Sequence, residues 1–518
     1  MLKKKIAILG STGSIGKTLV NIIKKDKKNF QVILLTSKKN YKELLKQARF
    51  LKVKNLIITD YESYLQIKKY RFSKNIKIYN TFDEFKKIFK KKVDYTMSSI
   101  TGIEGLKPTL DIIRYSKKIA IANKESIICG WGLINKELKK NKTKFIPVDS
   151  EHFSLWYGLI NTEIDLIEKI YLTASGGPFY RTPLKKFKDV KIKQALKHPN
   201  WKMGKKISID SATMINKIYE VIEAKNIFNI PYSKIEILVH PKSYVHAIIK
   251  LKNGLTKIIV HDTTMKIPIF NTLYNNTKKT LKSDKLKIDL LNNLKFNKVE
   301  YNRYPMIKIL NYLSNKHSLY ETIIVSANDA LVDLYLKKKI KFVYQNKALG
   351  TGDAVLKTKK LITGSHFLIL FPDDLILKKN CSKEMISLHK KFNCSVMASI
   401  KVNKKNVSRW GIFSKKKKIS KKNFLINDVV EKPKQNEAPS NNAVIGRYIL
   451  PVEIFKKLEI QNKGIGGEIH ITDSIRKLIF NNFKFIGHNF AGKYLDCGTM
   501  SGYIKSSFEI AKLWNYAW

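Results

Sequence analysis

The sequence predicts an α/β protein whose N-terminal part is a Rossmann-like, doubly wound parallel sheet. Three observations lead to this prediction. The apolar run at residues 5–10 has the length of a buried strand and passes through a glycine-bearing loop into a helical pattern. A second apolar run, FQVILLT from residue 30, follows that helix. Five further short apolar runs, separated by helical patterns, continue to residue 149, and such alternation favours a parallel sheet with helices on both faces.

Length and composition indicate a folded protein of several domains. The chain has 518 residues, which is too long for one ordinary core and implies roughly three or four domains. Hydrophobic residues make up 44% of the chain and aromatic residues 11%. This is enough to form several buried cores, so the composition excludes wholesale disorder.

The formal net charge of +58 invites comparison with nucleic-acid-binding proteins, but the kind of basic residue argues against that class. Only eight of the 99 basic residues are Arg, whereas proteins that read nucleic acids favour Arg for bidentate contacts. Because Lys is spread along the whole chain, we expect solvated Lys-rich faces and no specific nucleic-acid partner. The positive field should still attract anionic substrates.

Cysteine usage and hydropathy predict a cytoplasmic protein with no membrane partner. The four cysteines show no C-x-x-C or other metal-binding spacing, which fits a reduced compartment. The basic N-terminus is followed by the apolar run IAIL, which is too short for the core of a signal peptide. No window of the sequence is apolar enough to span a bilayer.

The first glycine-bearing loop predicts a dinucleotide site. Gly10, Gly13 and Gly16 form G-x-x-G-x-x-G, a variant of the dinucleotide fingerprint that permits a tight turn and directs a helix N-terminus at a pyrophosphate. The second strand ends in the run SKKN at residues 37–40, where an NAD site would carry Asp or Glu for the ribose hydroxyls. Basic and amide groups suit the 2′-phosphate instead, so the residues favour NADPH.

The stretch at residues 145–223 combines ligands for a metal with donors for a phosphate. Carboxylate oxygens are suited to a hard divalent cation, and the stretch supplies Asp149, Glu151 and Glu220. Hydroxyl, amide and ammonium donors suited to a phosphate come from Ser175, Ser211, Asn216 and Lys217. Asn216 and Glu220 are spaced i, i+4 in a helical pattern and share one face. Any one of these residues would more often be a surface or capping residue, but the group indicates a phosphorylated, sugar-like substrate.

The same stretch resembles a known enzyme family. The motifs VDSEH, SGGPF, HPNWxMG and DSATMxNK, in this order, are similar to those of 1-deoxy-D-xylulose 5-phosphate reductoisomerase, and the resemblance covers residues 1–342. It implies an NADPH-dependent enzyme that uses Mg²⁺ or Mn²⁺ to make 2-C-methyl-D-erythritol 4-phosphate for isoprenoid synthesis. It also implies a possible homodimer. The implied domains are an NADPH-binding domain (1–150), a catalytic metal and substrate domain (151–270), and a connection with a truncated helical region (271–342).

The resemblance also implies a role for individual residues. The metal ligands are Asp149, Glu151 and Glu220, and the catalytic residues are these three with Lys124 and His198. The implied cofactor contacts are Thr12, Gly13, Ser14, Ile15, Lys39, Asn40, Asn123, Glu125 and Gly204. The implied substrate contacts are Lys124, Ser150, Glu151, Ser175, His198, Ser211, Asn216, Lys217 and Glu220. HPNWKMG at residues 198–204 corresponds to a mobile flap that closes over the substrate.

A second family resemblance begins at residue 344. The segments YQNKALGTGDAVL, FLILFPDDLI, GGEIHITDSI and KYLDCGTMSGYIKS resemble bacterial UTP–glucose-1-phosphate uridylyltransferase as far as residue 518. The resemblance implies a partial α/β nucleotidyltransferase domain over residues 343–518, in which Asp373 or Asp374, and Asp496, could bind Mg²⁺. The family's G-x-G-T-R…P-K loop, which grips the nucleotide phosphates, occurs nowhere in the sequence.

These patterns together predict a reductoisomerase joined near Phe342 to an incomplete uridylyltransferase. Two alternatives stay open at this point. One is a uridylyltransferase that makes UDP-glucose, or a bifunctional enzyme. The other is an inactive fusion of two truncated enzymes.

Overall fold

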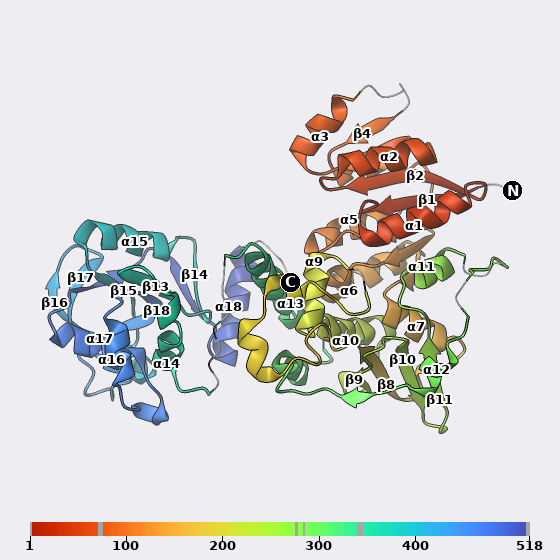
Figure 1. The fold of residues 1–518 in the computed structure, drawn as a ribbon. Helices are drawn as coiled ribbons and strands as arrows, with labels where there is room; N and C mark the ends of the chain where they lie inside the picture. The colour runs from red at the N-terminus through yellow and green to blue at the C-terminus, as the bar shows by residue number, and fades with distance from the viewer. Residues whose placement is uncertain are drawn as a thin grey trace. The chain divides into compact units, whose positions relative to one another are not determined.

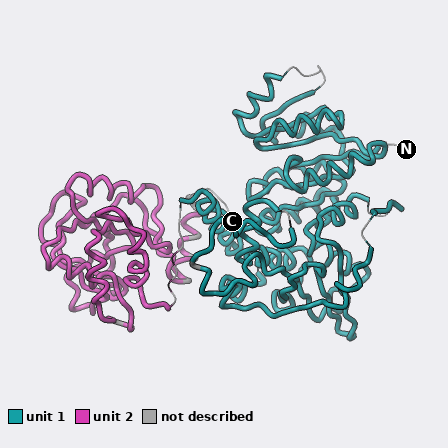
Figure 2. Tube along the Cα trace, in the orientation of Figure 1, with its two compact units in different colours: residues 1–341 teal, residues 342–518 magenta. Residues whose placement is uncertain are grey.

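The computed structural model describes residues 3–70, 76–201, 203–274, 278–282, 285–316, 318–339, 343, 345 and 347–513. The chain divides into two compact units, residues 1–341 and residues 342–518 (Figure 2). The junction predicted near Phe342 falls on a residue outside the described ranges. Each unit has its own sheets and its own hydrophobic clusters.

The N-terminal sheet confirms the predicted doubly wound α/β fold (Figure 1). Its strands are β1 (Lys4–Leu9), β2 (Phe30–Ser37), β3 (Asn55–Ile58), β4 (Lys77–Tyr79), β5 (Tyr95–Ser98), β6 (Lys118–Ile121) and β7 (Lys144–Pro147). They run in the order β4-β3-β2-β1-β5-β6-β7, and every neighbouring pair is parallel. The strand order reverses between β1 and β5, so ligands are expected beyond the carboxyl ends of these two strands.

Helices connect the strands of this sheet. They are α1 (Ser14–Lys25), α2 (Tyr41–Leu51), α3 (Tyr61–Lys68), α4 (Phe85–Ile88), α5 (Leu106–Ile113) and α6 (Lys124–Lys140), and α7 (Ser150–Gly158) follows the last strand. The turn from β1 into α1 depends on glycine because Gly10 has φ +79°, and a Cβ there would lie 2.7 Å from Ser99 O. A Cβ on Gly16 would lie 2.6 Å from Ser11 Cα. These close approaches hold the start of α1 against the end of the sheet.

A second sheet, of mixed strand direction, follows the N-terminal sheet along the chain. Its strands are β8 (Ile167–Ala174), β9 (Ile235–Val239), β10 (Val245–Leu251), β11 (Thr256–Val260) and β12 (Asn297–Lys298), in the order β11-β10-β8-β9-β12. The strand-like run at residues 237–251 is two strands, because the chain turns at residues 240–244, where Ser243 has φ +51°. Helices α8 (Ile192–Ala195), α9 (Lys205–Ala212) and α10 (Ile215–Phe228) lie between β8 and β9 in the sequence.

The rest of the first unit returns to both sheets. Helix α11 (Lys266–Leu273) places Ile269 and Phe270 in the same hydrophobic cluster as Ile6 and Ile8 of β1. Helix α12 (Ile288–Asn292) and a 3₁₀ helix over Pro305–Tyr312 follow. The last described helix of the unit, α13 (Tyr320–Leu336), packs against α6 and α9, so the end of this unit contacts helices that follow strands of both sheets in the sequence.

The second unit is built around a six-stranded mixed sheet in the order β13-β18-β15-β19-β17-β16, with β14 and β20 paired separately. The strands are β13 (His366–Leu370), β14 (Asp374–Leu377), β15 (Ser395–Lys401), β16 (Gly411–Lys418), β17 (Asn423–Glu431), β18 (Asn442–Pro451), β19 (Phe485–Asn489) and β20 (Lys493–Asp496). The helices are α14 (Thr351–Leu356), α15 (Cys381–Phe392), α16 (Ile454–Glu459), α17 (Ile471–Phe480) and α18 (Met500–Leu513). Phe413 and Phe485 are fully buried in its core. Across the described parts of both units, no helix combines the length and the apolar character needed to cross a bilayer.

Candidate active site

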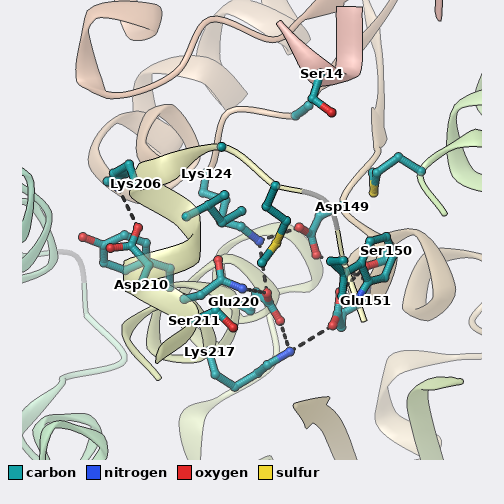
Figure 3. Close-up of a pocket in the computed structure, with 18 of the residues that line it drawn as sticks. Ser14, Lys124, Asp149, Ser150, Glu151, Lys206, Asp210, Ser211, Lys217 and Glu220 are labelled. Carbon is teal, nitrogen blue, oxygen red and sulfur yellow. Dashed lines mark hydrogen bonds and ion pairs between the residues drawn. The ribbon is translucent and has the colours of Figure 1, made fainter. Parts of the chain in front are cut away.

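A cavity of about 530 Å³ lies in the first unit where the loops after β1, β5, β6 and β7 meet α9 and α10 (Figure 3). Most of the residues implied by the motifs line it. On the cofactor side these are Gly13, Ser14, Ile15, Asn123, Glu125 and Gly204. On the metal and substrate side they are Lys124, Asp149, Ser150, Glu151, Ser175, His198, Ser211, Asn216, Lys217 and Glu220. Residues as far apart in the sequence as Gly13 and Glu220 are thus brought to one cavity.

Three residues implied as cofactor contacts do not line the cavity. The Thr12 hydroxyl lies 2.9 Å from the Ser37 hydroxyl, Lys39 pairs with Asp60 at 3.6 Å, and Asn40 caps α2 by accepting from the Glu43 N–H. All three lie just after the carboxyl ends of β1 and β2, where the sequence predicts that the 2′-phosphate of NADPH binds. The Lys39 side chain is 73% exposed and its ion pair is weak, so it remains available to an anion.

Three carboxylates converge in the cavity. Asp149 is the N-cap of α7, Glu151 lies in the first turn of that helix, and Glu220 comes from α10. One oxygen from each residue lies within 4.8 Å of the others. An all-oxygen set of two Glu and one Asp, in a partly open cavity, fits a hard cation such as Mg²⁺ or Mn²⁺ that retains water or substrate oxygens.

Two buried lysines neutralise these carboxylates. Lys124 is bonded to Asp149 and lies 3.2 Å from Glu220 Oε1, and Lys217 lies 3.0 Å from Glu151 Oε1 and is also bonded to Glu220. Burial opposes the charged form of Lys124, but the surrounding carboxylates, Asp149 first, hold its pKa well above the usual range. Lys124 is only 7% exposed, so it is not one of the many solvated surface lysines of this Lys-rich chain.

The carboxylates are in unlike electrostatic environments. Burial raises the pKa of Glu151 to about 7, and the nearby charge of Glu220 adds to this effect. Asp149 is also buried, but Lys124 and His152 hold the pKa of Asp149 well below its usual range. Asp149 is therefore ionised near neutral pH, whereas Glu151 is only partly ionised there. A bound cation would favour the charged form of Glu151.

The side of the cavity opposite the dinucleotide loop carries polar donors. His198 Nδ1 accepts from the backbone N–H groups of Asn200 and Trp201 at 3.1 and 3.0 Å. The ring proton of the neutral imidazole therefore lies on Nε2, which donates to Ser175 Oγ at 3.0 Å. Burial lowers the pKa of His198 to about 4, so the ring is neutral near pH 7. Asn216 Nδ2 donates to Glu220 Oε1 at 2.5 Å, as their i, i+4 spacing predicts.

The dinucleotide side is formed by the ends of β1, β5 and β6. Gly13 is the N-cap of α1, and no acidic residue lies in the first turn of that helix, so its N–H groups are free to face an anion. Asn123 caps α6 by accepting from the Ser126 N–H at 2.6 Å, and its Nδ2 donates to Gly102 O at 2.8 Å. These features fit a dinucleotide laid across the switch between β1 and β5.

Several ionisable residues of the site were missed by the sequence analysis. Lys206, Asp210 and Tyr219 line the cavity. Glu223 lies 3.6 Å from the Lys124 ammonium group, and His152 lies 3.7 Å from Glu223. Burial would lower the pKa of His152, but Glu223 and Asp149 raise it to about 9. A helical signal was available for two of them, because His152 follows Asp149 by three positions and Glu223 follows Glu220 by three. Lys206 gave no comparable signal in a chain so rich in Lys.

Comparison with protein families and solved structures agrees with this geometry. Residues 6–131 match the model of 1-deoxy-D-xylulose 5-phosphate reductoisomerase, and residues 145–228 match the model of its C-terminal domain. Residues 299–512 match the nucleotidyl transferase model, so the resemblance of the second unit to nucleotidyltransferases is confirmed at the level of that family.

Three individual proteins show how far the similarity reaches. A 1-deoxy-D-xylulose 5-phosphate reductoisomerase from Pelagibacter ubique is 61% identical over 341 residues, which cover 65% of this chain and 88% of the relative. The structure of the Zymomonas mobilis enzyme in complex with NADPH is 32% identical, with TM-score 0.60 over 70% of this chain and 92% of that one. A reductoisomerase structure with NADPH, fosmidomycin and magnesium is 29% identical, with TM-score 0.60 over 69% and 89%. The chain therefore belongs to the 1-deoxy-D-xylulose 5-phosphate reductoisomerase family, with a nucleotidyl transferase-like unit after its reductoisomerase part.

Proposed function

We propose that the first unit converts 1-deoxy-D-xylulose 5-phosphate to 2-C-methyl-D-erythritol 4-phosphate with NADPH and Mg²⁺ or Mn²⁺. The observation that carries this proposal is the cluster of Asp149, Glu151 and Glu220, with Lys124 and Lys217, in the same cavity as the dinucleotide loop. When bound, the cation supplies Lewis-acid stabilisation of substrate oxygens, and NADPH supplies the hydride that reduces the rearranged carbon skeleton.

Different residues of the cavity bind the cation and stabilise charge on the substrate. Asp149, Glu151 and Glu220 hold the cation. Lys124 and Lys217 form ion pairs with these carboxylates. A cation bound to the same carboxylate oxygens would compete with the two lysines, which leaves their ammonium groups available to the substrate. Because these ammonium groups are buried, they can stabilise negative charge that develops on substrate oxygens.

The phosphate is proposed to bind on the side formed by Ser175, Ser211, Asn216 and Lys217, with the neutral His198 as a further donor through Nε2. Binding energy from this non-reacting end orients the reacting carbons. Residues 198–204 act as the flap over the substrate, and Gly204, the N-cap of α9, is its downstream end.

The domain assignments follow from the same proposal. Residues 1–150 bind NADPH through Thr12–Ile15 in the first loop, with Lys39 and Asn40 at the 2′-phosphate and Asn123, Glu125 and Gly204 near the nicotinamide. Residues 151–270 form the catalytic domain, residues 271–342 form the connection with helical support, and residues 343–518 form a partial nucleotidyltransferase domain. We also propose a homodimer in the cytoplasm.

The Glu220→Gln variant tests the metal assignment. Glu220 accepts bonds from Lys124, Lys217 and Asn216, so removing its charge should lower Mn²⁺ affinity and NADPH oxidation by at least roughly a hundredfold. The matched control is Glu236→Gln, which changes a Glu that is 42% exposed on β9 and should alter neither quantity. Metal-dependent NADPH oxidation that persists in the Glu220 variant would contradict the assignment.

A second candidate function, uridylyl transfer, is favoured by the nucleotidyl transferase match over residues 299–512. Asp374 is engaged as an acceptor from Gly446 N and the Tyr494 hydroxyl, and Asp496 pairs with Arg409 at 2.7 Å, which leaves Asp373 as the freest of the proposed Mg²⁺ ligands. The sequence has no G-x-G-T-R…P-K loop to grip the nucleotide phosphates. We therefore expect no UDP-glucose from UTP and glucose 1-phosphate, and chromatographic detection of UDP-glucose would establish the bifunctional alternative.

A further inference from the structure

One half-buried lysine next to the metal site is surrounded by acids that belong to three different elements. Lys206 Nζ lies 2.5 Å from Glu125 Oε1, 3.1 Å from Asp210 Oδ2 and 2.9 Å from Asp329 Oδ1. Glu125 is at the start of α6, Asp210 is one turn further along α9, and Asp329 is on α13. These four residues are called the Lys206 cluster, and Figure 3 shows Lys206 facing Asp210 at the edge of the cavity.

Each element in the Lys206 cluster has a different relation to the cavity. Lys206 is two residues after Gly204, at the downstream end of the flap, and Ser211 lies further along the same helix. Glu125 follows Lys124 directly and lines the cavity beside Asn123. Helix α13 is the last helix of the first unit and supplies no residue to the cavity lining.

The cluster is too buried to be an ordinary surface ion pair. The Glu125 and Asp210 side chains are 8% and 3% exposed, and Lys206 is 20% exposed over the ring of Tyr219 at 5.1 Å. Asn328, next to Asp329, donates to Asp210 Oδ1 at 2.8 Å. Helix α13 therefore contacts α9 through two side chains, Asn328 on Asp210 and Asp329 on Lys206. Three carboxylates around one ammonium would repel one another if that ammonium were lost, and the repulsion would separate α6, α9 and α13.

We propose that Lys206 is a positioning residue through which α13 holds the flap end and the start of α6 in the arrangement that binds NADPH. The proposal rests on the proposed reductoisomerase function. Asp329 sets the position of Lys206, and Lys206 sets the distance between Gly204 and Glu125. In this way α13, which touches neither ligand, contributes to cofactor affinity.

The proposal predicts a selective effect, because within the described part of the chain no hydrogen bond or ion pair joins the Lys206 cluster to the three metal ligands. In the full-length chain, Lys206→Met should raise the Kd for NADPH on the order of tenfold, and Asp329→Asn should raise it severalfold. The double variant should be no worse than Lys206→Met alone, because the two changes remove the same interaction. Lys206→Arg should restore most of the affinity.

The experiment measures NADPH affinity by calorimetry and Mn²⁺ affinity by electron paramagnetic resonance on each variant. The matched control is Asp333→Asn, which removes an exposed pair with Lys337 on the same helix, at 2.7 Å. We expect NADPH affinity to fall in the Lys206 and Asp329 variants only, with Mn²⁺ affinity unchanged in all of them. Asp329 is 28% exposed, so its variant should fold even if Lys206→Met does not.

Three distinguishable results would contradict either the proposed function or the positioning role of Lys206. Wild-type protein that does not bind NADPH at all contradicts the proposed function. Wild-type and Asp329→Asn proteins that bind NADPH equally contradict only the positioning role. A parallel loss of NADPH and Mn²⁺ affinity, with no recovery in Lys206→Arg, reduces the cluster to a structural ion pair.

Discussion

At the scale of single residues, the site is defined by buried charges that compensate one another. Lys124, Lys217 and His152 oppose Asp149, Glu151, Glu220 and Glu223 within one cavity and its wall. The carboxylates alone would repel one another, so in the absence of a metal the lysines keep them together. The motifs predicted five of these seven side chains and missed His152 and Glu223. They did not predict the pairing, because it depends on which helix faces bring the side chains into contact.

The burial of His246 predicts how the stability of the protein depends on pH. His246 is 1% exposed and stacks on His261 at 3.7 Å between ring centroids, and burial, with His261 next, holds the pKa of His246 well below 6.5. The unfolded chain gains a proton as pH falls through 6.5 while the folded ring stays neutral, so stability is lost in that direction. Relative to His246→Phe, the wild type should lose up to about 1.4 kcal/mol per pH unit below 6.5.

The measurement is urea unfolding at pH 7, 6 and 5, followed by hydrogen exchange of the β10 amides (Val245–Leu251). Burial also raises the pKa of Glu151 and Glu223 to about 7 and lowers the pKa of His261, but these groups are present in both proteins, so the difference reports on His246 together with its contact to His261. An identical pH dependence in wild type and variant would contradict a neutral buried His246.

At the scale of elements, the passage from β1 to α1 fixes the dinucleotide side of the cavity. A Cβ on Gly16 would lie 2.6 and 2.7 Å from backbone atoms of Ser11, whereas a Cβ on Gly132 in α6 would meet nothing within 4 Å. Gly16→Ala should therefore destabilise the protein by about 1–3 kcal/mol and weaken NADPH binding. Gly132→Ala should be neutral or stabilising by up to about 1 kcal/mol. Thermal unfolding and NADPH titration of both variants provide the check, and equal behaviour of the two would refute this packing.

The elements also show where prediction from sequence succeeds and where it stops. Short apolar runs and glycine loops are local signals, so the parallel sheet and the α1 turn could be predicted. The contact of α13 with the site could not, because Asn328 and Asp210 are 118 positions apart and, although Asp210 begins the motif DSATMxNK, Asn328 belongs to none of the quoted motifs. For the same reason Lys206 was missed, whereas Lys124 was found through the motif around it.

At the scale of the whole molecule, the chain joins two units that have separate cores. Every described residue of the proposed reductoisomerase cavity belongs to residues 1–341, and the reductoisomerase match covers 88% of the relative from Pelagibacter ubique. The part of the relative not covered does not remove any member of the carboxylate cluster or the dinucleotide loop. We therefore expect the first unit to carry a complete catalytic apparatus, with α13 as its last support.

The most direct test is NADPH consumption by the purified full-length chain with 1-deoxy-D-xylulose 5-phosphate and Mg²⁺ or Mn²⁺. The account predicts oxidation that requires both the substrate and the metal and that is lost in Glu220→Gln. A folded chain that binds NADPH and Mn²⁺ but does not oxidise NADPH would contradict it, and would favour an inactive fusion of two truncated enzymes.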